Sequence, residues 1–150
     1  IKVSENNTMN ANCPLCTADG GELIWKNDEL RVILANEPEY PGFCRVIWNA
    51  HVSEMTDLAI ADRSKLMQTV MKVEQAIIEV MQPSKVNLAA LGNMVPHLHW
   101  HVIPRYQNDK TFPGSVWSVP VRDSDPTHLA TQFAKVPALK QKLIHVLGAH

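Results

Sequence analysis

Apolar and polar positions along the chain predict five short strands. Residues 23–26 and 31–35 are apolar segments on either side of the turn-forming trio Asn27-Asp28-Glu29, and together they predict a β-hairpin. The segment 36–42 contains two prolines and a glycine, which exclude regular structure, so we expect a loop there and a third strand over 43–48. Residues 85–91 and 98–103 predict two further strands, joined through 92–96.

A helical period lies between the third and fourth predicted strands. Apolar residues at steps of three and four predict a helix from Asp62 to Met81, with one stripe formed by Leu66, Val70, Val73, Ile77 and Val80. We expect Asp62 to cap the start of this helix and Pro83 to stop it.

The end of the chain also predicts helix. Asp125-Pro126 has the chemistry of an N-cap followed by a first-turn proline, and a second helical stretch after Pro137 ends at Gly148. The predicted fold class is therefore α+β: an antiparallel sheet of about five strands, one long central helix, and a helical C-terminal tail.

Length and composition place the chain among single-domain globular proteins. It has 150 residues, no internal repeat and no long linker, so we expect one domain over 1–150. A net charge of −1 provides no broad basic field, which excludes nucleic acid and anionic membranes as partners. No apolar run is long enough for a membrane span, and the first seven residues lack the apolar region of a signal peptide. We therefore expect a cytoplasmic protein.

Three histidines fall within five residues, at His97, His99 and His101. Alternate side chains of a strand point to the same face, so the three imidazoles are expected on one side, and Leu98, Trp100 and Val102 on the other side in the core. Such a cluster can bind a metal, or it can catalyse phosphoryl or nucleotidyl transfer with one imidazole as nucleophile. Purely structural histidines are the remaining interpretation.

The sequence His97-Leu98-His99-Trp100-His101-Val102-Ile103 resembles the signature of the histidine-triad (HIT) family. The resemblance includes the Pro41-Gly42-Phe43 turn, the following strand, His51, the central helix and the terminal Pro104-Arg105. It covers a core of about 13–105 and leaves 106–150 as a C-terminal extension.

The resemblance implies an enzyme that cleaves at the α-phosphate of a nucleotide. His99 matches the nucleophile, which would form a nucleotidyl-phosphohistidine, and His101 matches the histidine that contacts the phosphate and assists the leaving group. His97 matches the histidine that orients its neighbours or, in some members, ligates zinc. The implied substrates are diadenosine polyphosphates or related phosphoanhydrides and phosphoramidates.

The resemblance also implies residues that hold the substrate. Asn36 matches the position that binds the ribose hydroxyls, although a turn-forming asparagine before Glu37-Pro38 is an equal local interpretation. Asn93, beside Gly92, and Asn87 resemble family residues near the phosphate. Arg105 can stabilise anionic charge, or it can be a solvated strand end.

Two residues depart from the family pattern. The histidine usual after Pro-Gly is Phe43 here, and the Ser or Thr common before the triad is Met94. These departures affect the expected substrate and rate more than the reaction class.

The pair Cys13-x-x-Cys16 predicts a metal or redox pair, because the chain lacks a secretory signal. The resemblance implies a structural zinc site made of Cys13, Cys16, His51 and His97, with no organic cofactor. Holding His97 on zinc would position His99 and would compensate for Phe43. A redox pair and two inert buried thiols are the alternatives.

The sequence leaves two rival functions open. One is a metallohydrolase in which all three triad histidines bind a catalytic zinc. The other is a nucleotide-binding adaptor without turnover, which Phe43 and Met94 make conceivable. The expected partners are a small nucleotide and a second copy of the chain, since family members commonly dimerise. Trp117 either reaches an active site across that dimer or simply packs.

Overall fold

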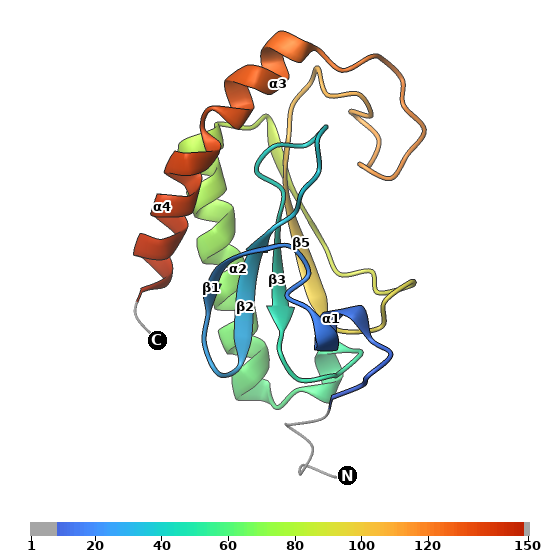
Figure 1. Ribbon diagram of the computed structural model, residues 1–150, viewed down its shortest axis with the longest axis vertical. Helices are drawn as coiled ribbons and strands as arrows, with labels where there is room; N and C mark the ends of the chain where they lie inside the picture. The colour runs from blue at the N-terminus through green and yellow to red at the C-terminus, as the bar shows by residue number, and fades with distance from the viewer. Residues whose placement is uncertain (1–8, 149–150) are drawn as a thin grey trace.

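A five-stranded antiparallel sheet forms the centre of the molecule, in the order β1-β2-β3-β5-β4 (Figure 1). The structure is a computed structural model that describes residues 9–148. The segment that carries the signal-peptide argument therefore lies outside the described residues. The strands are β1 (Glu22–Lys26), β2 (Leu30–Leu34), β3 (Cys44–Trp48), β4 (Lys85–Ala89) and β5 (His99–Arg105). The predicted α+β fold with its five antiparallel strands is confirmed.

The predicted turn between β1 and β2 forms for the expected reason. Asn27 Oδ1 accepts hydrogen bonds from the backbone N–H groups of Glu29 and Leu30, both at 2.9 Å, which closes the β1–β2 hairpin. Strand limits differ from the prediction by one or two residues. The largest consequence is at β5, which begins at His99, so that His97 and Leu98 precede the strand.

The long helix α2 (Ile60–Met81) covers one face of the sheet and packs beside α4 (Val136–Leu147) (Figure 1). Its start corrects the predicted cap. Ala59 takes the N-cap position with an extended backbone, and Asp62 lies inside the first turn, where its charge suits the helix dipole. Its end is as predicted: Gln82 adopts a left-handed conformation just before Pro83. Among residues 9–148, no helix is long and apolar enough to cross a membrane.

The helical tail also forms as predicted. Helix α3 (Pro126–Phe133) is capped by Asp125, whose carboxylate accepts from the N–H groups of Thr127 and His128. Helix α4 ends at Leu147 and is capped by Gly148, whose φ of 76° suits a residue without a side chain. Two short elements were not predicted: α1 (Pro14–Thr17) and a 3₁₀ turn at Met55–Asp57.

The two faces of the sheet differ in composition. The face against α2 and α4 is apolar. Its strand residues include Val32, Val46 and Val102, and Leu98, just before β5, and Trp100 also pack there. This confirms the predicted core side of the histidine strand. The opposite face has a smaller apolar cluster built from Ile33, Ala35, Tyr40, Phe43, Ile47 and Ile103. Strand alternation places Arg45, His99 and His101 on this second face, which we call the open face.

Candidate functional site

Four side chains predicted to bind metal meet at one end of the open face. The ligand atoms of Cys13, Cys16, His51 and His97 all lie within 4.8 Å of one another, although the residues are up to 84 positions apart. We call this group the Cys–His cluster. Among the described residues, it is the one group that can hold a metal ion, and His99 and His101 do not belong to it. The three triad histidines therefore do not form one ligand set.

Helix α1 brings the two cysteines together. Cys13 is its N-cap and Pro14 its first residue, a position where the missing proline N–H costs nothing. The buried Arg31 of β2 fixes this helix by donating to the carbonyls of Leu15 at 2.6 Å and Ala18 at 3.2 Å. The Cys-x-x-Cys turn is thus tied to the sheet by a charged side chain.

His97 is oriented by a backbone carbonyl. Its Nε2–H donates to the Trp48 carbonyl at 2.6 Å, so Nδ1 keeps its lone pair. That Nδ1 lies 3.3 Å from Cys13 Sγ and 3.5 Å from Cys16 Sγ, and His51 Nδ1 lies 3.4 Å from Cys16 Sγ. Burial lowers the pKa of His97, against the raising effect of the Trp48 carbonyl, which favours the neutral imidazole.

These distances fit a tetrahedral ion. Metal–sulfur bonds of about 2.3 Å and metal–nitrogen bonds of about 2.0 Å put neighbouring sulfur and nitrogen ligands about 3.5 Å apart. Two thiolates and two neutral imidazoles are a ligand set that zinc accepts, and the carbonyl behind His97 is the usual support for such a ligand. The cluster can therefore hold a metal ion.

His99 and His101 form a separate pair on β5, with ring centroids 4.9 Å apart. His99 Nδ1 donates to the carbonyl of His97 at 2.5 Å, which leaves the lone pair of Nε2 free. Burial lowers the pKa of His99, so that its ring is neutral and nucleophilic near neutral pH.

His101 is enclosed by Arg45, which the sequence did not assign to the site, and by Phe43 and Trp117 of the same chain. Arg45 Nε donates to His101 Nδ1 at 3.3 Å, and the rings of Phe43 and Trp117 meet His101 edge-on with centroids at 5.6 and 5.0 Å. Burial, with smaller contributions from His99 and Arg45, lowers the pKa of His101 to about 4.

The Nε2 atoms of both histidines reach open space. Within residues 9–148, every buried side-chain nitrogen and oxygen has a hydrogen-bond partner. Neither His99 nor His101 is an exposed residue, and no bond to protein engages either Nε2. A side-chain nitrogen without a partner is therefore not buried in this part of the chain, which leaves both Nε2 atoms accessible to a ligand. A cavity of about 210 Å³ lies beside His99 and is also lined by Leu91 and Gly92.

The predicted substrate residues lie in different places. Asn93 is exposed on the loop between β4 and β5, and Asn36 is exposed at a second cavity of about 270 Å³ that Glu37 and Phe133 also line. No hydrogen bond or ring contact described for residues 9–148 joins either asparagine to the triad histidines.

Arg105 and Asn87 contact each other inside the protein. The Arg105 guanidinium, 1% exposed, donates to Asn87 Oδ1 at 2.8 Å and forms an ion pair with Asp109 at 2.8 Å. It also donates to the carbonyl of Gly114 at 2.7 Å. These bonds fix the segment that leads to Trp117.

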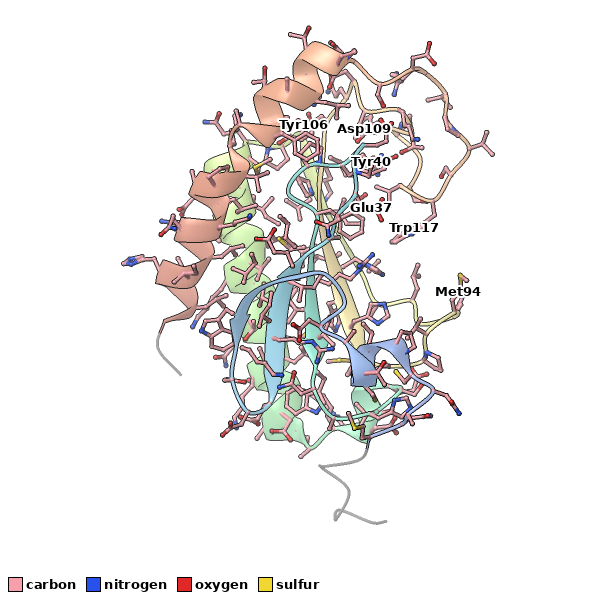
Figure 2. The ribbon with its side chains drawn as sticks, in the orientation of Figure 1. Glu37, Tyr40, Met94, Tyr106, Asp109 and Trp117 are labelled. Atoms are coloured by element: carbon pink, nitrogen blue, oxygen red, sulfur yellow. The ribbon has the colours of Figure 1, made fainter. Side chains whose placement is uncertain are left out.

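Trp117 contacts His101 of its own chain, so the C-terminal extension (106–150) reaches the site without a second copy. Trp117 is half exposed. Figure 2 shows Trp117 and Met94 on the side of the molecule away from α4. Met94, which replaces a family Ser or Thr, is 95% exposed. Arg45 is the single charged residue in an otherwise apolar predicted strand, which could have marked it as a site residue. The local sequence does not indicate which residue it contacts across the sheet.

Known proteins resemble this chain over most of its length. Residues 19–108 match the family model of the HIT domain. An "AP-4-A phosphorylase" from Mycobacterium tuberculosis is 28% identical over 134 residues, which cover 83% of this chain and 69% of that protein. A "bis(5'-nucleosyl)-tetraphosphatase [asymmetrical]" from Schizosaccharomyces pombe is 32% identical over 95 residues, 59% of this chain and 52% of that protein.

Solved structures agree with this match. A histidine triad protein from Bradyrhizobium japonicum superimposes with a TM-score of 0.66 at 27% identity, covering 84% of this chain and 92% of its own. A zinc-bound histidine triad family protein from Mycobacterium smegmatis has a TM-score of 0.62 at 21% identity, with 93% and 98% covered, and shares the fold.

Proposed function

The chain belongs to the HIT family, and we propose that it cleaves dinucleoside polyphosphates, or a related phosphoanhydride or phosphoramidate, at the α-phosphate through His99. Family membership supports a nucleotide hydrolase or transferase. The names of two relatives, a phosphorylase and a tetraphosphatase, support a dinucleoside tetraphosphate as substrate.

One observation carries the proposal: His99 has its proton fixed on Nδ1 and its Nε2 lone pair open. The 2.5 Å bond to the His97 carbonyl sets this arrangement without any further residue. A neutral imidazole with a free, accessible nitrogen is a competent nucleophile.

The reaction follows from that nitrogen. Nε2 of His99 forms a bond to the α-phosphorus while the bond from phosphorus to the bridging oxygen breaks, and the leaving nucleoside polyphosphate departs with those electrons. Water, or inorganic phosphate, then forms a new P–O bond as the Nε2–P bond breaks, with loss of one proton to solvent. His101 donates a hydrogen bond to a phosphate or leaving-group oxygen.

The other predicted residues have supporting roles in this proposal. Asn36 and Asn93 contact the ribose and the phosphate. Arg105 and Asn87 act through the C-terminal segment that they hold, because their polar atoms are engaged with each other and with Asp109.

The Cys–His cluster holds a structural zinc ion in this proposal, since its ligand set and spacing fit that metal. Metal analysis of the purified protein tests this. We expect about one zinc per chain in the wild type and much less in Cys13→Ser, whereas Cys44→Ser, a buried thiol outside the cluster, retains it. Equal zinc in both variants would contradict the assignment.

Assembly and location complete the proposal. The protein acts as a homodimer in the cytoplasm. The outer edge of β4 offers an unpaired strand to a second copy. Sedimentation at micromolar concentration measures the oligomeric state.

The decisive experiment combines products with a trapped intermediate. Diadenosine tetraphosphate attacked at the α-phosphate releases ATP, and the second product is AMP with water or ADP with phosphate. Mass spectrometry of protein quenched during turnover should locate an adenylyl group on His99, and His99→Ala should give neither adduct nor product. Nucleotide binding without adduct or product would instead favour an adaptor.

A further inference from the structure

We propose that Arg45 is a positioning residue that holds His101 in one tautomer, with the ring proton on Nε2, and that it acts through its Nε–H hydrogen bond rather than through its charge. This inference rests on the proposed function, because it concerns the donor that His101 offers to substrate. Arg45 touches His101 and acts through it.

The sheet register places the two side chains together. Arg45 lies opposite His101 in the antiparallel pairing of β3 and β5, and both point to the open face. Arg45 Nε donates to His101 Nδ1 at 3.3 Å. A guanidinium has donors only, so Nδ1 must be the acceptor, and the single proton of the neutral ring then sits on Nε2.

Arg45 is itself fixed. Its Nη1 donates to the carbonyl of Gly20 at 3.2 Å, and its guanidinium lies over the Phe43 ring, 5.2 Å from the centroid. The same Phe43 ring contacts His101 with its edge. Phe43, which stands where the family resemblance leads one to expect a histidine, thus supports both partners of the hydrogen bond.

The surroundings of His101 keep its ring neutral. The charged or titratable groups that face it are His99 from β5 and Arg45 from β3, and Trp117 and Phe43 contribute only aromatic surface. The low pKa of His101, due first to burial, means that the ring carries no charge at neutral pH. His101 therefore carries an uncharged Nε2–H on the same face of the sheet as His99, whose ring it contacts.

Three substitutions separate the hydrogen bond from the charge. Glutamine places its amide nitrogen the same number of bonds from Cβ as arginine places Nε, so Arg45→Gln keeps a donor at that position and removes the charge. Arg45→Met puts a methyl group there and removes both. Arg45→Lys keeps the charge on a more distant atom and has a methylene where Nε was.

Two measurements are made on each variant. Side-chain ¹⁵N NMR of His101 in the ligand-free protein reports which ring nitrogen carries the proton and needs no substrate. Steady-state kinetics with diadenosine tetraphosphate reports kcat and KM separately. Circular dichroism and thermal melting restrict the comparison to folded protein.

We expect Arg45→Gln to retain the Nε2–H signature and to keep kcat within about threefold of wild type, whereas Arg45→Met and Arg45→Lys show mixed tautomers and lose about 10²-fold in kcat. The inference is overturned if Arg45→Met keeps the wild-type NMR pattern, or if Arg45→Gln loses as much activity as Arg45→Met. Wild-type protein with the expected NMR pattern but no turnover would instead refute the proposed activity and leave the positioning role intact.

Discussion

The first histidine of the triad and the other two have the same spacing in the sequence and different surroundings in the structure. His97 is fully buried, and its two ring nitrogens face the Trp48 carbonyl and the cysteine sulfurs. His99 and His101 each have one nitrogen engaged and one open. The difference arises because β5 begins at His99, so that His97 lies on the preceding loop, where α1 and His51 can reach it.

A matched pair of substitutions should give the largest contrast. His99→Gln removes the nucleophile, and we expect kcat to fall by about 10⁴-fold or more with little change in stability. His97→Gln breaks the Cys–His cluster, and we expect a loss of about 3 kcal/mol in unfolding free energy. Activity per folded His97→Gln molecule should stay within about tenfold of wild type, because the carbonyl that orients His99 remains.

Turnover and urea unfolding, measured on the same preparations, test this contrast. If His97→Gln lost as much activity per folded molecule as His99→Gln, the division of roles between the two histidines would be wrong.

The next effect concerns the anchor of the C-terminal segment. Asp109→Asn leaves the buried Arg105 guanidinium without its countercharge, and we expect a loss of about 3 kcal/mol in stability, measured by urea unfolding. Asp123→Asn, on an exposed residue of the same segment, is the control and should change stability by less than about 0.5 kcal/mol. Equal effects would show that the ion pair contributes nothing specific.

Stability should depend on pH through His101. Its folded pKa is lowered to about 4, so between the unfolded value of about 6.5 and pH 4 only the unfolded chain takes up the proton. Stability therefore falls as pH drops through this window and levels off below it. His101→Gln should flatten the slope by up to about 1.4 kcal/mol per pH unit.

Denaturant titrations at pH 4.5, 5.5, 6.5 and 7.5 would measure these slopes. His145→Gln, on an exposed face of α4, serves as the control. Parallel curves for His101→Gln and wild type would argue against burial of a neutral ring.

The smallest effect is expected at Trp117. Removing its contact with His101 in Trp117→Ala should lower kcat/KM about three- to tenfold, the scale of one aromatic contact. Val119→Ala, two residues further along the same exposed segment, should leave kcat/KM unchanged. If the two variants were equally active, Trp117 would be a surface residue with no part in the site.

Local patterns in the sequence predicted most of the fold. The spacing of Val70, Val73 and Ile77 was enough for α2, and the prolines at 83 and 126 marked helix limits. The α1 turn was missed because four residues carry no periodicity. The prediction that Asp62 caps α2 was wrong, because Ala59, three residues earlier, takes the extended N-cap conformation.

Site residues that belong to a sequence motif could be predicted. Site residues that meet only through the pairing register of two strands could not. The four residues of the Cys–His cluster came from the family resemblance, and the structure brings them together. Arg45 meets His101 only because β3 pairs with β5 in one register, 56 residues apart. Trp117 lies against His101 at the end of a segment that is bonded to the distant Arg105 through Asp109 and Gly114. Such non-local contacts have no local signature.

The bond that orients His99 has a consequence for how such a site can change over time. Its acceptor is the main-chain oxygen of residue 97, an atom that every amino acid supplies. The Cys–His cluster, in contrast, needs the imidazole of that same residue. A lineage can therefore lose the metal ligands one by one while the nucleophile keeps its proton in place. The residues at positions 13 and 16 can therefore vary among related proteins while His99 stays the same, without any change in the backbone.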